Sequence, residues 1–277
     1  MSSVTDTGRT ARTRAVAAYR MPDLAISLLP PILSAVLVLA VWEGFVRLND
    51  VPAYLLPAPT LILTVLIERF DLLMRQLGFT AMASALGFVI ALVSGIAVGA
   101  AISASRIFDR AVYPWLVISH AIPKVVIAPL FLVWFGFGMT SEVLFVVVFT
   151  FFPIVVNTVA GLKSADPEML QLARSMTASP LQSLWKIKIP GALPTIFAGI
   201  KISITMAPVG AVIGEFVASN VGLGHVLIQA VGSLETPLAF AAVVVISIFG
   251  IAIWYAAEAI ERLSIPWHAS QRTASTH

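Results

Sequence analysis

Long stretches of apolar residues without a charge recur along the chain, and short polar segments separate them. A helix needs about 20 apolar residues to cross the hydrocarbon core of a bilayer. Residues 24–42, 76–105, 125–141, 143–162 and 236–257 approach or exceed this length, and residues 189–214 do so with the single interruption of Lys201. The pattern predicts an all-α integral membrane protein with about six spanning helices, near residues 28–48, 80–103, 112–136, 140–162, 194–216 and 236–258.

The composition supports this prediction, because 59% of the residues are hydrophobic and 11% are charged, against about 25% charged residues in soluble domains. The absence of cysteine excludes disulfides, thiol nucleophiles and cysteine-based metal sites. Residues 1–22 are polar and basic and precede an apolar stretch, as in a signal peptide. That stretch, from Leu24 to Trp42, is longer than the usual ~7–15 residues and lacks a small-x-small cleavage site. We therefore expect a retained first span, with a cleaved signal as the alternative.

The basic residues concentrate on one side of this topology. Six spans place both ends of the chain on the same side; if that side is the cytoplasm, inside segments hold twelve of the 17 Lys and Arg residues and outside segments hold three. The inside residues are Arg9, Arg12, Arg14, Arg20, Arg106, Arg110, Lys163, Arg174, Lys186, Lys188, Arg262 and Arg272. The positive-inside rule then predicts cytoplasmic termini in a multi-pass protein of the cell inner membrane. It also explains the net charge of +3 without a nucleic acid partner.

This topology predicts a cytoplasmic N-terminal tail (1–22), one transmembrane domain (23–265) and a C-terminal tail (266–277). A polar loop at residues 163–193 is expected in the cytoplasm, between the fourth and fifth spans. The outer loop, residues 49–79, begins with prolines that favour extended backbone, and from Thr60 to Leu77 it mixes apolar and charged residues. We expect this later part to be a helix lying on the outer interface; a solvated connector is the alternative.

Small residues and prolines make the spans uneven. Gly87, Ala91, Gly95 and Gly99 place a small residue at every fourth position of the second span, which allows another helix backbone to approach closely. Prolines interrupt three further spans, namely Pro114, Pro123 and Pro129 in the third, Pro153 in the fourth and Pro208 in the fifth. Because a proline frees a backbone carbonyl, which is tolerated only against protein or water, this pattern favours a protein with a cavity or moving parts.

The loop at residues 163–193 carries the signals of two short helices. Asp166 suits an N-cap and Pro167 the first helical position, so a helix is predicted to run to about Met176. Ser179, Pro180 and Gln182 repeat the signal with a capping box, and this second helix is predicted to run to about Lys188 and to stop before Pro190 and Pro194. Helices of about ten residues have no core of their own, so their apolar residues need a partner surface.

The same loop resembles that of the permease subunits of ATP-binding-cassette (ABC) importers, which carry Glu-Ala-Ala, three residues, Gly, nine residues, Ile, any residue, Leu and Pro. Gln171, Leu172 and Ala173 stand at Glu-Ala-Ala and Thr177 at Gly, followed by Ile187, Ile189 and Pro190. Ala173, Ile187 and Pro190 match outright. Because a β-branched residue disfavours a positive φ, we expect the turn at Thr177 to differ from a glycine turn.

Further segments are similar to the permeases for nitrate, taurine and aliphatic sulfonates. They are residues 123–138, residues 152–158, residues 161–164, Gly214-Glu215-Phe216 and Gly222-Leu223-Gly224. The resemblance covers about residues 55–260. It implies a type I ABC importer permease fold and the transport of a small, anionic solute such as a sulfonate, taurine or nitrate.

The resemblance also implies partners. They are two ATPase subunits that bind ATP and Mg, an extracytoplasmic solute-binding protein, and a second permease copy in a homodimer. The chain has no phosphate-binding Gly-x-x-x-x-Gly-Lys-Ser/Thr loop, so it is expected to be a transporter subunit without enzymatic activity or a bound cofactor of its own. The predicted contact with the ATPase comprises Gln171, Leu172, Ala173, Arg174, Met176, Thr177, Ala178, Ser179 and Pro180.

Ionisable residues within spans are candidates for the translocation path, since they are costly in a bilayer. Lys124, with His120 nearby, would suit an anionic solute; a lysine that is buried against freed carbonyls or that snorkels is the alternative. Glu215 is a candidate for a gate or for a structural pair. Isolated histidines exclude a metal site of the usual kind, and no catalytic triad is recognisable.

Two other classes of protein compete with the importer permease. A stand-alone secondary transporter would use acidic residues within the spans, which are few, and often an inverted repeat, which is not evident. An integral membrane enzyme would need clustered acids, histidines or metal ligands at one membrane face. Co-purification separates the three, because a permease should bring an ATPase with it.

Overall fold

The computed structural model of the chain describes residues 20–265, with side chains from residue 29 onward. The predicted C-terminal tail, and all but the last three residues of the predicted N-terminal tail, lie outside this range. Every regular element in the described part is helical, which confirms the all-α prediction. Contacts divide the chain into two compact units, Met1–Thr64 and Val65–His277, which are described separately.

The first unit contains α2 (Arg20–Leu48) and the start of α3 (Pro59–Glu68). Residues Leu29–Leu48 are long and apolar enough to cross a membrane, which agrees with the first predicted span. The segment between the two helices is held by one carboxylate, because Glu43 accepts hydrogen bonds from the backbone N–H of Thr60 at 3.0 Å and from its hydroxyl at 2.8 Å.

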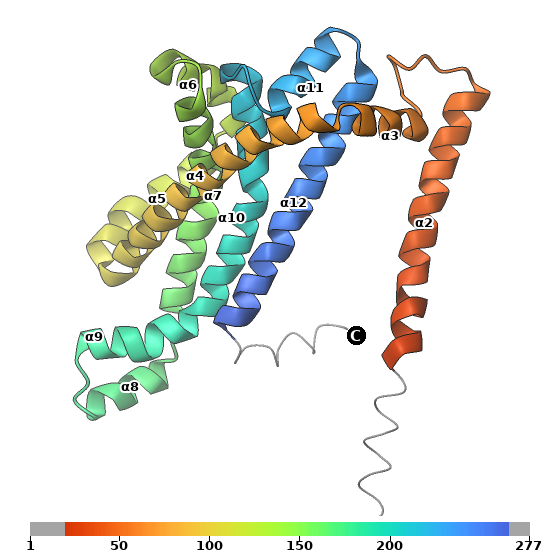
Figure 1. Cartoon of the computed structure of the whole chain (residues 1–277). Helices are drawn as coiled ribbons and strands as arrows, with labels where there is room; N and C mark the ends of the chain where they lie inside the picture. The colour runs from red at the N-terminus through yellow and green to blue at the C-terminus, as the bar shows by residue number, and fades with distance from the viewer. Residues whose placement is uncertain (1–19, 266–277) are drawn as a thin grey trace, which may run out of the picture. The chain divides into compact units, whose positions relative to one another are not determined.

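The second unit is a helical bundle (Figure 1). Its elements are α4 (Phe70–Ala104), α5 (Arg106–Ala121), the 3₁₀ turn η1 (Lys124–Ile127), α6 (Ala128–Phe135), α7 (Met139–Lys163), α8 (Pro167–Ser175), α9 (Pro180–Ser183), the π-helical turn η2 (Leu184–Lys188), α10 (Ile189–Ala218), α11 (Leu223–Gly232) and α12 (Thr236–Ser264). In the described part of the whole chain, five helices are long and apolar enough to span, or six if α5 and η1–α6 count as one.

The helix that contains the second span is longer than predicted. The prediction of one interfacial helix from Thr60 to Leu77 is wrong. Helix α3 ends at Glu68, and residues from Phe70 onward belong to α4. At 35 residues α4 is about 52 Å long, well beyond the ~30 Å hydrocarbon core. Its charged first turns, with Asp71 and Arg75, can therefore lie outside the apolar layer without ending the helix.

The third predicted span, residues 112–136, is bent and not straight. The helices on either side of the break meet at 89°. Pro123 causes the break, since it lacks a backbone N–H and holds Ile122 in an extended conformation (φ −71°, ψ 127°). The other two prolines do not interrupt a helix, because Pro114 lies within α5 and Pro129 lies in the first turn of α6.

The prediction that the second short helix stops before Pro190 is also wrong. Residues Pro180–Ala218 form one helical run of 39 residues, in which α9 passes through η2 into α10. A proline ring in an α-helix clashes with the carbonyl four residues earlier. The wider π turn lies directly before Pro190 and changes that spacing, so the chain continues as a helix (Figure 1).

The core of the second unit lies where α7 packs between α4 and α10. The small-residue stripe of α4 makes this packing possible. A Cβ atom added to Gly87, Gly95 or Gly99 would lie 2.4–2.8 Å from side-chain atoms of α7. The α7 side chains concerned are Val146, Ile154 and Thr158. The close helix approach that the stripe predicts is therefore confirmed.

Candidate functional site

The first candidate site is the hairpin of α8 and α9, defined here as residues 166–188. The side chain of Asp166 accepts a hydrogen bond from the backbone N–H of Glu168 at 2.8 Å, with Pro167 at the first helical position. At the second helix, the Gln182 N–H donates to Ser179 Oγ at 3.2 Å and the Ser179 N–H donates to Gln182 Oε1 at 2.8 Å. Both predicted N-caps and the capping box are thus confirmed.

The turn between the two helices is a Schellman motif centred on Thr177. The Ala178 N–H donates to the Ala173 carbonyl at 2.9 Å and the Thr177 N–H donates to the Arg174 carbonyl at 3.0 Å. Thr177 has φ +58°, the left-handed conformation that glycine adopts at this position of the motif. The expectation that threonine would change the turn is therefore wrong, and the hydrogen bonds hold the β-branched residue in an unfavourable conformation.

The hairpin exposes an unusual amount of apolar surface for a polar segment. Its large apolar side chains Met169, Leu172, Met176, Leu181 and Trp185 are 50–71% exposed. A groove of about 330 Å³ lies between its helices, lined by Met169, Leu172, Ala173, Met176, Ala178, Gln182, Ser183, Lys186 and Ile187. An apolar groove with a polar rim is typical of a protein-binding surface.

Most residues predicted to contact the ATPase are accessible on this surface. Gln171, Leu172, Arg174, Met176, Thr177, Ser179 and Pro180 are exposed. Ala178 is half-buried and lines the groove, while Ala173 is 7% exposed, so that it forms part of the floor. A partner would therefore meet Ala178 within the groove and the other residues around it.

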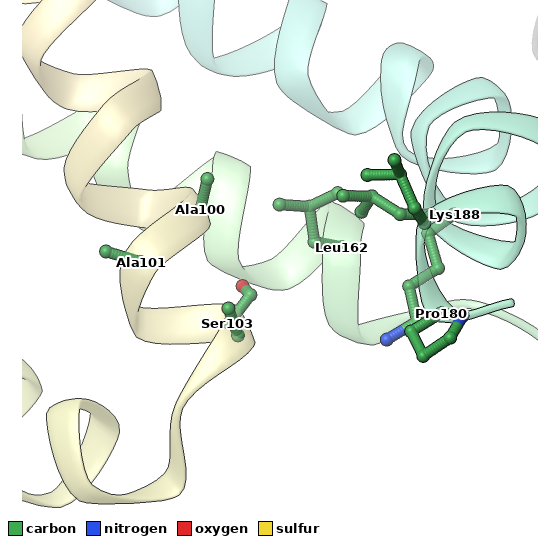
Figure 2. Close-up of a pocket in the computed structure, with 9 residues that line it drawn as sticks. Ala100, Ala101, Ser103, Leu162, Pro180 and Lys188 are labelled. Carbon is green, nitrogen blue, oxygen red and sulfur yellow. The ribbon is translucent and has the colours of Figure 1, made fainter.

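The base of the hairpin packs against the spans through a small hydrophobic cluster. Leu162 of α7 packs with Ala192 and Ile196 of α10, and Leu184 of η2 joins them. Beside this cluster, α9 and the end of α4 leave a second groove of about 660 Å³ (Figure 2). It is lined by Ala100, Ala101, Ser103, Ala104, Leu162, Pro180, Leu181, Leu184 and Lys188. The free part of the hairpin thus projects from a small anchored base.

The second candidate site contains two of the three residues predicted for the translocation path. His120 at the end of α5 and Lys124 at the start of η1 flank the proline break and face α7. The His120 ring stacks on Phe152 with centroids 3.8 Å apart, and the Lys124 ammonium lies 5.4 Å from the ring centroid of Phe149. The structure therefore brings His120 and Lys124 together.

Glu215, the third predicted path residue, belongs to a different group at the end of α10. It is fully buried, and its Oε2 accepts a hydrogen bond from the Gly224 N–H at 2.6 Å. The preceding N–H groups of Gly222 and Leu223 donate to Gln76 Oε1 at 2.6 Å and Thr80 Oγ1 at 2.9 Å. Side chains of α4 and α10 thus hold three consecutive N–H groups at the start of α11.

Two groups of charged residues were not predicted. Glu142 of α7 is 1% exposed, and the Ser219 side chain lies near its carboxylate. Lys201 of α10 pairs with Glu258 at 2.7 Å and with Glu261 at 2.9 Å, both on α12. Lys201 was visible in the sequence as a charge within a span, but nothing in the pattern indicated its partners.

Proteins named as transport permeases are similar in sequence to most of the chain. The riboflavin transport system permease protein RibX of Chloroflexus aurantiacus is 34% identical over 94% of this chain and 96% of its own length. The formylaminopyrimidine transport permease protein ThiX of Halalkalibacterium halodurans is 33% identical over 88% and 97%. The taurine transport system permease protein TauC of Escherichia coli K12 is 29% identical over 83% and 86%.

The fold agrees with a solved transporter structure. An inward-facing structure of the MetNI methionine ABC transporter superposes with a TM-score of 0.58 at 23% identity, covering 71% of this chain and 97% of that chain. A model of the family described as binding-protein-dependent transport system inner membrane component matches residues 87–267. The chain therefore belongs to this family and is a multi-pass inner membrane permease of the ABC importer type.

Proposed function

We propose that this chain forms half of the translocation path of an ATP-driven importer and receives the force of ATP hydrolysis through the α8–α9 hairpin. In this proposal two copies form the membrane core. Two separate ATPase subunits bind ATP and Mg in the cytoplasm, and an extracytoplasmic binding protein delivers the solute. The observation that carries the proposal is the hairpin itself, which is internally capped yet leaves an apolar groove open.

The construction of the hairpin suits the transmission of force. Its caps and its Schellman turn satisfy backbone groups within the hairpin, so these groups need no hydrogen-bond partner outside it. Its exposed apolar side chains gain stability when another protein covers them. A rigid short element with an apolar contact surface can carry a displacement from a docked subunit into α10, to which it is directly joined.

The solute is proposed to be small and anionic, as a sulfonate or taurine is. Lys124 supplies a cation within the bent third span, and the name of the taurine permease of Escherichia coli agrees with such a solute. The names of the riboflavin and formylaminopyrimidine permeases, which are more similar in sequence, refer to ring compounds. The residues around Lys124 determine which of these two kinds of solute, a small acyclic anion or a ring compound, the chain would favour.

The sidedness of the hairpin can be tested directly, because the chain has no cysteine and single-cysteine variants give unambiguous labelling. Ser175→Cys places a thiol on the hairpin, and Ser233→Cys places one directly after α11, which lies at the other end of the bundle in Figure 1; both positions are exposed. In intact spheroplasts a membrane-impermeant maleimide should label Ser233→Cys and leave Ser175→Cys unlabelled until the cells are lysed. Labelling of Ser175→Cys in intact spheroplasts would refute the proposal.

The coupling role predicts the effect of a bulky charge in the groove. Ala178→Arg should leave the permease in the membrane and abolish at least nine-tenths of ATP-dependent uptake, because the guanidinium fills the groove that the ATPase would occupy. Uptake is measured in proteoliposomes that contain the whole complex. Ser233→Arg, at an exposed position on the opposite end, is the matched control and should retain uptake. Uptake at the unmodified rate by Ala178→Arg would contradict the role.

A further inference from the structure

Three aromatic rings and one cation gather at the proline break of the third span. They are His120 and Lys124 beside the break, and Phe149 and Phe152 on α7. This set is named the aromatic cluster. Phe152 covers one face of the His120 imidazole at an interplanar angle of 11° and holds the ring in place, while His120 itself remains exposed. The cluster therefore offers a flat, polarisable surface beside a positive charge.

The cluster lies near the middle of α7, one of the helices long and apolar enough to span a membrane. Helix α7 runs for 25 residues from Met139 to Lys163. Phe149 follows its first residue by about 15 Å and precedes its last residue by about 21 Å, at 1.5 Å per residue. Phe152 is one turn further along. The Lys124 ammonium, which lies over Phe149, is thus far from both ends of this candidate span.

A lysine at this depth cannot face lipid without a large cost, because an ammonium in hydrocarbon loses its hydration. Among the described residues, no carboxylate lies within ion-pair distance of Lys124. Lys201, by contrast, has two carboxylate partners on α12. The half-buried Lys124 therefore suits a surface that faces water or a solute of opposite charge.

We propose that the aromatic cluster is a solute-binding wall that selects a planar ring bearing an anionic group. The ring of the solute stacks on the exposed imidazole of His120, and its anionic group approaches the Lys124 ammonium. Aromatic rings gain from offset stacking beyond the burial of their area, whereas a saturated ring of the same size does not. The inference rests on the proposed function, since it assigns the cluster to the translocation path.

The experiment compares two sulfonates of equal charge and similar size, benzenesulfonate and cyclohexanesulfonate. Their dissociation constants are measured by saturation-transfer NMR with the full chain in lipid nanodiscs. Benzenesulfonate should bind about two- to tenfold more tightly. Equal affinities, or tighter binding of cyclohexanesulfonate, would overturn the inference.

Variants separate the ring from the charge. Phe152→Leu removes the support of the imidazole and should bring the ratio of the two dissociation constants to about one. Lys124→Met should weaken both sulfonates by a similar factor and keep the ratio. Phe137→Leu, at a position that is 69% exposed and outside the cluster, is the control and should change neither constant.

Folding and function are checked in parallel. If Phe152→Leu lowers the melting temperature, His120→Leu replaces it as the ring variant with the same expected ratio. A ring preference that survives both variants would overturn the inference. If ATPase subunits bind and drive uptake while both sulfonates bind equally, only the ring selection fails. If no ATPase binds the chain, the proposed function itself fails.

Discussion

The two ends of the second unit satisfy their backbone hydrogen bonds in opposite ways. At the hairpin turn, the N–H groups around Thr177 and Ser179 bond to partners within six residues, and apolar side chains remain exposed. At the α10–α11 junction, the N–H groups of Gly222 and Leu223 bond to side chains more than 140 residues away in sequence. There the neighbouring Glu215 is fully buried.

This difference separates a part that can move from a part that holds the bundle together. The hairpin can keep its internal hydrogen bonds when its base is displaced, because few of these bonds involve the spans. The junction cannot shift without breaking bonds between α4, α10 and α11, which leaves buried polar groups unpaired. We infer that force enters at the local element and that the junction is a fixed point of the bundle.

The largest expected effect tests whether the junction is a fixed point. Gly222 and Gly136 both have backbone conformations that are essentially restricted to glycine, with φ +95° and +76°. An added Cβ would lie 2.2 Å from the Glu215 carboxyl carbon at Gly222 and would meet nothing within 4 Å at Gly136. Gly222→Ala should therefore lower the free energy of unfolding by about 2–6 kcal/mol, and Gly136→Ala by only about 1–3 kcal/mol.

The measurement is chemical unfolding of both variants in the same mixed micelles. The difference between them reports the packing of Glu215 against the junction, because the backbone strain is common to both. Equal losses of stability would mean that Glu215 and its neighbours can move to accept the added methyl group. The α10–α11 junction would then not be a fixed point of the bundle.

A smaller effect is expected when one distant acceptor is removed. Thr80→Val keeps the shape of a fully buried side chain but leaves the buried Leu223 N–H without its acceptor, at a cost of about 1–3 kcal/mol. Thr205→Val is the matched control, since the Thr205 hydroxyl donates only to carbonyls of its own helix and its loss should cost less than about 0.5 kcal/mol. Unfolding midpoints in the same denaturant series check both variants. An unchanged midpoint for Thr80→Val would contradict the claim that hydrogen bonds at the α10–α11 junction hold the bundle together.

The smallest effect concerns the hairpin. Thr177→Gly should stabilise the turn by up to about 1 kcal/mol, because glycine adopts φ +58° without steric cost but loses more chain entropy on folding. Hydrogen exchange of the Ala178 amide measures the local stability and should slow by up to about fivefold. Ser175→Gly, within α8, should instead speed the exchange. Faster exchange in Thr177→Gly would show that threonine makes contacts that favour the turn.

Features that depend on neighbours in sequence could be predicted. The caps at Asp166 and Ser179 and the spans themselves follow from residue type and spacing over a few turns. The stripe of Gly87, Gly95 and Gly99 predicted a close helix contact, although not that α7 would be the partner. These are local rules, and the structure follows them.

Features that depend on distant partners could not be predicted. The pairing of Lys201 with Glu258 and Glu261 joins residues 57 and 60 positions apart, and no pattern links them in advance. The bend at Pro123 is of the same kind, since Pro114, Pro153 and Pro208 remain within helices. Whether a proline breaks a span depends on what surrounds its freed carbonyl, and tertiary packing decides that.

The π turn at Leu184–Lys188 has a mechanical consequence. It replaces a flexible joint with five residues of continuous helix, so α9 cannot swivel independently of α10. A π turn holds one residue more than an α turn, so deleting one residue there would restore an α turn and keep α10 in phase with the hairpin, whereas a deletion within α10 would rotate the side chains beyond it by about 100°. Each side of α10 thus keeps a fixed rotational relation to one side of the hairpin, along about 58 Å of helix from Pro180 to Ala218.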